Sequence, residues 1–205
     1  MKKQLQQIIL TTMLSVCIGL SNQVSAQTFW TNLNSPNTAR YYAIAHDGTK
    51  MYASNGLAGS PYAQFYYKQG ACAWNAITMS GVSTATSFNN IYCTSAGNLI
   101  AIGSQGATTV AFRSTDNGST WTQSTYSLTG FNPGIVEDAS GNIYIYNEVG
   151  TNISFVKSTD DGVTFSSPNP TFNIKYLTAT GNTLYAVKSG VSVWNVHKST
   201  DGGAT

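Results

Sequence analysis

The sequence predicts an all-β fold: a β-propeller of four-stranded antiparallel blades, with about four blades present and the last one incomplete. The first observation behind this prediction is a repeated motif, Ser-Thr-Asp-x-Gly-x-Thr-aromatic, whose aspartates lie 44 and then 41 residues apart. A period of about 40–50 residues is typical of stacked or radial repeats in which each unit is one supersecondary element. The copies occupy 114–121, 158–165 and 198–205, the last without its closing aromatic residue.

The second observation is a hairpin pattern that recurs in step with this motif. Each unit opens with two alternating apolar strands joined by a glycine-containing turn, and the alternation is strict in 143–146, Ile-Tyr-Ile-Tyr. Glycine and asparagine tolerate the positive φ that tight turns need, so each copy predicts a β-hairpin. The copies lie at 42–54, 91–103, 134–146 and 176–188.

Composition is the third observation. Charged residues make up only 9% of the chain and aromatic residues 12%, which suits many short strands with tight turns. A third strand, at 110–113 or 154–157, leads into each motif, and a fourth is expected after it. The unit length favours a propeller over a β-solenoid, whose repeats are usually nearer 20–30 residues.

The repeated motif resembles the Asp-box of the BNR repeat family, which is found in sialidases, sortilin-type receptors and many secreted bacterial β-propellers. The resemblance implies that the aspartate accepts hydrogen bonds from its own turn, that the glycine permits the reversal, and that the aromatic residue packs under the next strand. It therefore implies that these residues staple a blade and do no chemistry. They are Ser114, Asp116, Gly118, Thr120, Trp121, Ser158, Asp160, Gly162, Thr164, Phe165, Ser199, Asp201 and Gly203.

An earlier unit is degenerate. The segment 65–74 aligns without gaps to 112–121 and keeps both end aromatics, but it has Gln69 where the aspartate is expected. Phe29 and Trp30 are interpreted as the last strand of a still earlier unit. Because Asp-box propellers mostly carry six or more blades, we expect the chain to be part of a larger ring, truncated at its C-terminus.

The first 26 residues have the pattern of a secretory signal peptide. Lys2 and Lys3 precede an apolar stretch at 8–20 and a small-residue cleavage site ending at Ala26. We therefore expect residues 1–26 to be a leader and 27–205 to be the propeller domain of a protein that is secreted, surface-exposed or periplasmic. A partial lipobox ending at Cys17 leaves lipidation as an alternative.

The mature chain offers little for several classes of ligand. Without its leader the net charge is about zero, so no basic stripe remains for a phosphate backbone, and nucleic-acid binding is not expected. No Cys/His cluster has zinc spacing, and no metal or cofactor is predicted. Cys72 and Cys93 remain after cleavage, and a disulfide between them stays open, because the repeat puts one in an outer turn and the other in the next unit's first strand.

The repeat also predicts where a ligand could bind. In an up-and-down blade the first turns and motifs lie at one end, and the family resemblance implies that loops at the other end carry the ligand site. Seven of the eight acidic residues belong to the first end, which leaves Glu148, in the second turn 147–152. Arg40 and Lys175 lie in or near links on the candidate side, and Tyr62, Tyr126 and Phe131 lie in its loops. The predicted ligand-binding residues are Arg40, Tyr62 and Glu148.

These observations favour a secreted, non-catalytic propeller that binds a glycan or a protein, such as a surface protein, with no transmembrane segment. The alternative is a glycoside hydrolase, sialidase-like or similar to the Asp-box enzymes that cut xyloglucan. Hydrolysis normally needs two positioned carboxylates, and a sialidase also needs three arginines, whereas the mature chain has Arg40 and Arg113 alone. A third possibility is an assembly factor resembling the propeller family that helps to build photosystem II. His46 and His197 have no nucleophile beside them in the sequence and are interpreted as ordinary residues.

Overall fold

The structure is a computed structural model of the whole chain. It describes residues 32–35, 40–55, 65–83, 86–106, 108–124, 131–148, 155–168, 174–188 and 195–204, without the side chains of 131, 132, 148 and 188. The predicted leader 1–26 with Cys17, the Phe29-Trp30 strand, and Tyr62 and Tyr126 lie outside the described residues. Two units can be separated, Met1–Asn34 and Ser35–Thr205, and every strand belongs to the second.

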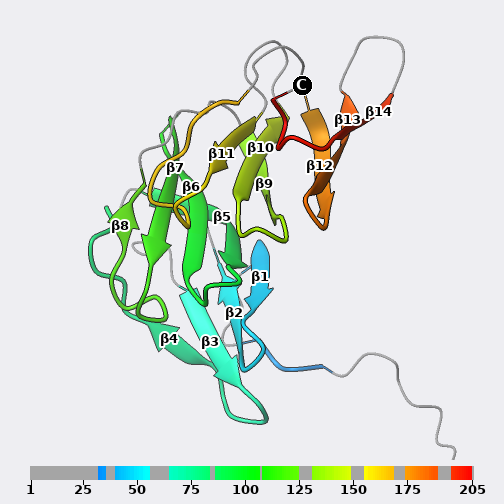
Figure 1. Cartoon of the computed structure of the whole chain (residues 1–205). Helices are drawn as coiled ribbons and strands as arrows, with labels where there is room; N and C mark the ends of the chain where they lie inside the picture. The colour runs from blue at the N-terminus through cyan, green and yellow to red at the C-terminus, as the bar shows by residue number, and fades with distance from the viewer. Residues whose placement is uncertain are drawn as a thin grey trace, which may run out of the picture. The chain divides into compact units, whose positions relative to one another are not determined.

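Within the described residues, the second unit contains four antiparallel sheets (Figure 1). We number them in chain order. Sheet 1 contains β1 (Ala43–His46), β2 (Lys50–Ser54), β3 (Phe65–Gln69) and β4 (Asn75–Ile77), and sheet 2 contains β5 (Thr86–Cys93), β6 (Leu99–Gln105), β7 (Thr108–Ser114) and β8 (Thr122–Gln123). Sheet 3 contains β9 (Phe131–Glu137), β10 (Ile143–Glu148) and β11 (Phe155–Ser158), and sheet 4 contains β12 (Ile174–Thr180), β13 (Thr183–Lys188) and β14 (Val196–Ser199).

The sheets have the up-and-down order that the sequence predicts, and the first strands of consecutive sheets touch: β1 contacts β5, β5 contacts β9, and β9 contacts β12. This radial arrangement confirms the propeller prediction. Within the described residues, sheets 3 and 4 have three strands rather than four. In sheet 3 the fourth strand is reduced to one bridge, in which Lys157 and Ser166 exchange two backbone hydrogen bonds of 2.7 and 2.9 Å.

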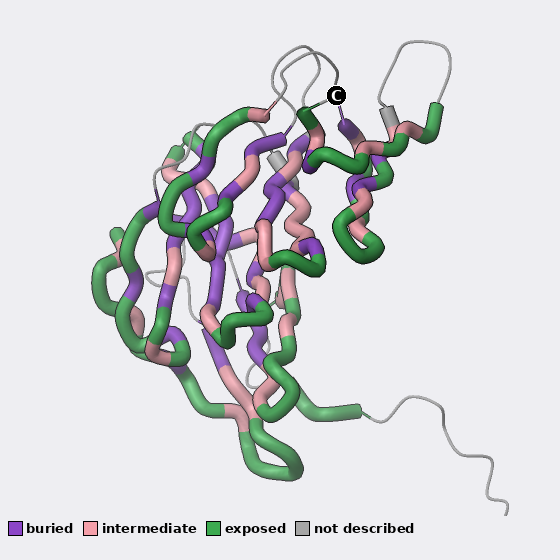
Figure 2. The backbone as a smooth tube through the Cα atoms, viewed as in Figure 1, coloured by how far each residue is buried: buried purple, intermediate pink, exposed green. Residues whose placement is uncertain are grey.

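The core lies between the sheets, and three apolar clusters join sheet 1 to 2, sheet 2 to 3 and sheet 3 to 4. Figure 2 shows buried residues concentrated along the strands and exposed residues in the turns. In β6, Ala101 faces sheet 1, whereas Ile100 and Ile102 face sheet 3. Because successive strand residues point to opposite faces, a strand buried on both sides becomes continuously apolar.

The aromatic residues of the repeated motif lie between sheets. Trp121 is 3% exposed, and its ring lies 5.4 Å from that of Phe65 in β3 and 6.4 Å from that of Phe88 in β5. Phe165 is 7% exposed and packs in the cluster between sheets 2 and 3. Their equivalent burial was predicted. The predicted packing partner was wrong, because each aromatic residue faces the preceding sheet rather than the strand that follows it.

The gapless alignment of 65–74 with 112–121 is also wrong, by one residue. Phe65 faces sheet 2, whereas Phe112, its supposed counterpart, faces sheet 1. The counterpart of Phe65 is Ala111, which faces forward to sheet 3. The first turn of sheet 1 is one residue shorter than that of sheet 2, since four residues separate His46 from Met51 and five separate Cys93 from Leu99. Gln69 therefore does not occupy the aspartate position.

Candidate functional site

The three copies of the motif, which we call the Ser-Thr-Asp loops (114–121, 158–165 and 199–204), share a hydrogen bond from the serine hydroxyl to the aspartate two residues later. In the first, Asp116 Oδ1 accepts from Ser114 Oγ at 2.8 Å and from Thr120 N at 2.8 Å, while its Oδ2 accepts from Thr120 Oγ1 at 2.6 Å. The same three bonds to Asp160 measure 2.7, 2.9 and 2.6 Å. In the third loop Asp201 Oδ1 accepts from Ser199 Oγ at 2.6 Å and Ala204 N at 3.0 Å.

These hydrogen bonds favour the ionised carboxylate. For Asp116, bonds from the Thr120 hydroxyl and backbone N–H, the largest influences, lower the pKa from 3.8 to about 2. At Asp160 burial acts to raise the pKa, but the bonds from Thr164 and Ser158 outweigh it and the net shift is downward. Such carboxylates stay ionised and fully engaged at neutral pH, so they are poor candidates for a general acid.

The residue after each aspartate reaches back to the preceding sheet. It has positive φ in all three loops, 59° at Asn117, 56° at Asp161 and 71° at Gly202. Asn117 Oδ1 accepts a 3.2 Å bond from the Tyr52 hydroxyl of sheet 1. Asp161 accepts from Arg113 of sheet 2 twice, at 2.6 Å from Nη2 to Oδ2 and at 2.7 Å from Nε to its carbonyl oxygen. The loops thus clamp consecutive sheets together.

The first turns hold the remaining carboxylates of this end. Asp138, which is 6% exposed, accepts from Ser140 N, Asn142 N, Asn142 Nδ2 and the Tyr144 hydroxyl at 2.7–3.0 Å. Asp47 accepts from Thr49 N at 2.7 Å and from Lys50 N at 2.6 Å. Glu137 accepts from Ser95 N and from Tyr92 at 2.8 and 3.3 Å, across the gap between sheets 2 and 3.

We call this end of the sheets the loop face and the other end the opposite face. All seven acidic residues predicted to lie on the loop face do lie there, and each one accepts at least one hydrogen bond from its surroundings. Burial acts to raise the pKa of Asp47 and Asp138, but their hydrogen bonds outweigh it and lower the pKa of both. The chemistry of the loop face is therefore structural.

The structure describes the predicted binding residues only in part. Arg40 is exposed and precedes β1, at the opposite face. Glu148 is the last residue of β10 rather than part of the turn, because a bulge after Tyr146 continues the pairing as far as Phe131. Lys175 is a strand residue of β12, with its Nζ 5.8 Å from the centre of the Tyr176 ring. Because Tyr62 and the side chain of Glu148 lie outside the described residues, a shared site of Arg40, Tyr62 and Glu148 stays a prediction.

The cysteines and histidines carry no reactive constellation within the described ranges. Cys72 and Cys93 are free, so the disulfide left open by the sequence is not formed. Burial, the larger influence, raises the pKa of the Cys93 thiol to about 12, which keeps it protonated. His46 Nδ1 accepts a 3.0 Å bond from Gly48 N. No group of three or more potential metal ligands occurs among the residues that the structure describes.

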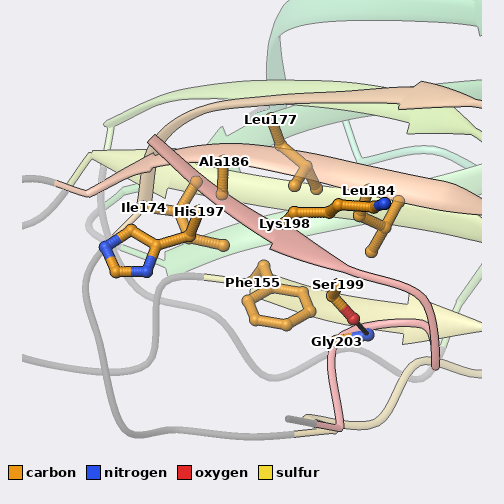
Figure 3. Close-up of a pocket in the computed structure, with 9 residues that line it drawn as sticks. All are labelled: Phe155, Ile174, Leu177, Leu184, Ala186, His197, Lys198, Ser199 and Gly203. Carbon is orange, nitrogen blue, oxygen red and sulfur yellow. Dashed lines mark hydrogen bonds between the residues drawn. The ribbon is translucent and has the colours of Figure 1, made fainter. Parts of the chain in front are cut away.

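A cavity of about 80 Å³ lies between β11 and sheet 4 (Figure 3). Its lining is mostly apolar, with Phe155 of sheet 3 facing residues of β12, β13 and β14. His197, which the sequence left as an ordinary residue, lines it together with Ser199 and Gly203. Two carboxylates that glycoside hydrolysis requires are not among the lining residues, so the cavity is suited to an apolar group.

Comparison with known proteins supports the fold of this chain but assigns it no activity. No family model matches the sequence, and no curated protein matches it either. Solved structures do match: a GH74 enzyme of Niastella koreensis has a TM-score of 0.58 at 20% identity over 80% of this chain and 23% of its own. YCF48 bound to a D1 peptide has a TM-score of 0.55 at 14% identity over 80% and 52%, and the Hadza microbial sialidase Hz136 has 0.53 at 17% over 80% and 43%.

These structures and the geometry of the sheets define the chain as a β-propeller. The chain spans between about a quarter and about half of the length of these three proteins. Membership of the BNR/Asp-box family stays a prediction, because no family model matches. No helix that could cross a membrane is found in the described part of the chain.

Proposed function

We propose that this protein is a secreted, non-catalytic β-propeller that binds a glycan or a protein through its opposite face. One observation carries the proposal: seven of the eight acidic residues accept structural hydrogen bonds on the loop face. Glycoside hydrolysis normally uses two carboxylates that flank the scissile bond. Glu148 alone remains for such a role in this chain.

The arginines also favour binding over hydrolysis. Recognition of a sialic acid carboxylate would use several guanidinium groups that can bond it in a bidentate manner. Arg113 is engaged with Asp161 between sheets 2 and 3, and Arg40 is the other arginine of the sequence. A single remaining arginine suits a binding surface better than it suits a sialidase site.

The similar structures support two kinds of function. One of them, YCF48, is bound to a D1 peptide, so the same fold can hold a peptide. Two others are a GH74 enzyme and a sialidase, which keeps glycoside hydrolysis as the second candidate for this chain. We propose export on the strength of the leader-like residues 1–26, and N-terminal sequencing of the secreted protein should begin near Gln27.

Binding and hydrolysis can be tested together. The secreted protein is applied to an array of immobilised glycans and incubated with sialosides, xyloglucan and aryl glycosides. Binding should be saturable, and Arg40→Ala or Glu148→Gln should weaken it about tenfold, equivalent to ~1.4 kcal/mol. The matched control is Val163→Thr, because Val163 is exposed on the loop face and should not affect binding.

The hydrolysis arm decides between the two candidates. No sugar should be released above the background of buffer alone. Release of sugar that Glu148→Gln abolishes without a change in melting temperature would make the protein an enzyme and refute the binding proposal.

A further inference from the structure

The first Ser-Thr-Asp loop contains a chemically labile step, Asn117-Gly118. In such a step the glycine nitrogen can attack the Cγ atom of the asparagine, because glycine has no Cβ to block the approach. A nitrogen–Cγ bond forms and closes a succinimide ring, while the bond from Cγ to Nδ2 breaks and ammonia leaves with the proton that the nitrogen gives up. Water then opens the ring to aspartate or isoaspartate. The product carries a negative charge that asparagine lacks.

The folded loop holds both reacting groups in other bonds. Gly118 N donates a buried 2.8 Å hydrogen bond to Ser114 Oγ, and this hydroxyl donates in turn to Asp116 Oδ1 at 2.8 Å. The side chain of Asn117 reaches the preceding sheet, where its Oδ1 accepts a 3.2 Å bond from the Tyr52 hydroxyl. Because nucleophile and target are each bound to a different group, the attack is slow as long as the loop stays in place.

The contact at Tyr52 depends on residue 117 being an amide. The Tyr52 hydroxyl has one hydrogen but lies within bonding distance of two acceptors, Asn117 Oδ1 at 3.2 Å and Asp47 Oδ2 at 3.1 Å. An asparagine resolves this competition, because reversal of its amide turns Nδ2 toward the hydroxyl oxygen as a donor, whereas an ionised aspartate has no donor. Burial acts to raise the pKa of Asp47, but hydrogen bonds from Lys50 and Thr49 outweigh it and lower the pKa. An aspartate at 117 would therefore face a second carboxylate across one hydrogen, and like charges repel.

The second Ser-Thr-Asp loop shows what a carboxylate at this position requires. Asp161 accepts a 2.6 Å bond from Arg113 Nη2 and a further bond from Asn98 Nδ2. In sheet 1 the place of Arg113 is taken by Tyr67, once the one-residue shift of the alignment is allowed for. The Nζ of Lys50 lies 5.4 Å from the centre of the Tyr67 ring and forms no ion pair among the described residues. The joint between sheets 1 and 2 thus lacks the guanidinium that accommodates a carboxylate between sheets 2 and 3.

We propose that Asn117 is a modification site, which deamidates when the contact between sheets 1 and 2 opens and then keeps that contact from closing fully. Opening releases Asn117 from Tyr52 and Gly118 N from Ser114, so that the nitrogen can attack. The new carboxylate meets Asp47 when the sheets return. Opening therefore leads to irreversible loosening wherever the open state is modified before it recloses. The inference concerns this joint alone and is independent of the proposed ligand binding.

The first test measures the reaction. The protein is kept for days at slightly alkaline pH and digested, and mass spectrometry quantifies aspartate and isoaspartate at 117. Ser114→Ala frees Gly118 N, and Tyr52→Phe removes the donor to Asn117, so each should raise the rate about fivefold, as for the loss of one hydrogen bond from the closed state. The matched control is Ser158→Ala, the same change in the second loop, which should leave the rate at 117 unchanged. A rate in the folded wild type equal to that in concentrated urea would overturn the proposal.

The second test measures what the product does. Asn117→Asp reproduces the aspartate product without changing the volume of the side chain, and it should lower the melting temperature by about 3 °C or more. In the Asp47→Asn background the same change should cost less, because the repelling carboxylate is gone. Tyr67→Arg should also recover part of the loss by supplying the group that Arg113 supplies to Asp161. An equal cost of Asn117→Asp in all three backgrounds would overturn the proposal, whatever the outcome of the glycan and hydrolysis assays.

Discussion

A single carboxylate organises each Ser-Thr-Asp loop: in the first two its oxygens accept hydrogen bonds from donors two residues before it and four after it, and in the third from donors two before and three after. This role could be predicted from the sequence, since aspartate readily bonds its own turn. The inter-sheet role of the next residue could not, because Asp161 and Arg113 are 48 residues apart. A signal was present, however: a basic residue precedes the serine in every loop, at Arg113, Lys157 and Lys198.

Loss of the loop carboxylate should destabilise the fold moderately. Asp160→Ala removes the acceptor of Ser158 Oγ, Thr164 N and Thr164 Oγ1. Since water can reach part of this exposed loop, we expect a loss of about 1–2 kcal/mol in the free energy of unfolding, or a melting temperature lower by about 3–6 °C. The matched control is Gln69→Ala at the exposed end of β3, which should change the free energy by less than about 0.5 kcal/mol. Equal losses in urea titrations would contradict this ranking.

The same carboxylates predict an acid-dependent contribution to stability. The folded-state pKa of Asp116 is lowered from 3.8 to about 2, so the folded protein binds this proton less readily than the unfolded chain does. The stabilisation is therefore complete above pH 3.8 and is lost as the pH falls toward 2. Asp116→Asn should melt below the wild type at pH 7, and the difference should shrink between about pH 4 and pH 2. A difference that circular dichroism finds constant over this range would refute the assignment.

At the scale of secondary-structure elements, the hairpins could be predicted because period-two patterning and glycine turns are local signals. The alignment of one unit with the next was harder to predict than the hairpins. The gapless alignment pairs Phe65 with Phe112, yet these side chains lie on opposite faces of their sheets, and a shift by one residue is what moves a strand's side chains to the other face. The gapless alignment of Gln69 with the loop aspartate failed for this reason.

The close approach of each loop to the preceding sheet predicts an intolerant glycine. Gly162 has a φ of 83°, and a built Cβ would lie 2.4 Å from Ile100 Cδ1 of β6. Gly181, in the tight turn between β12 and β13, also has positive φ, 57°, but nothing lies within 4 Å of a built Cβ. Gly181→Ala should therefore cost about 1–2 kcal/mol for backbone strain alone, and Gly162→Ala should cost about 1–3 kcal/mol more for overpacking.

A double variant separates the two causes. Ile100→Val removes the Cδ1 atom that the new methyl group would meet, so Ile100→Val/Gly162→Ala should recover part of the loss in a thermodynamic cycle. Strictly additive losses would show that the side chain of Ile100 is not the obstacle.

For the molecule as a whole, the repeat made the propeller predictable, since each unit repeats the same inward and outward faces. The ligand site was not predictable to the same degree. Its candidates Arg40, Tyr62 and Glu148 come from different units, and no periodic signal states how loops of different units meet. Loops carry function because they vary on a regular scaffold, and this variation removes the regularity on which the fold prediction relied.

Large apolar side chains are exposed on the outward faces of the first and fourth sheets within the described residues. Ile44 of β1 is 64% exposed, and on sheet 4 Val196 and Tyr176 are 74% and 58% exposed. Interior sheets bury the corresponding faces against a neighbour, so these two faces favour self-association. Ile44→Thr and Val196→Thr keep strand propensity and should lower the weight-average mass in sedimentation velocity. Val163→Thr, at an exposed valine in a loop, is the control and should leave it unchanged.

The backward reach of the Ser-Thr-Asp loops has a consequence for biosynthesis. The forward side of sheet 1, including Phe65, is covered by residues of the next unit such as Phe88 and Trp121, and the forward side of sheet 2 is covered in the same way by residues of sheet 3 and by Phe165. A nascent chain emerging from the ribosome thus always presents one unsealed sheet at its growing end. Assembly then proceeds from the N-terminus to the C-terminus, and a chaperone that shields this chain needs to cover only the most recently emerged unit at any moment.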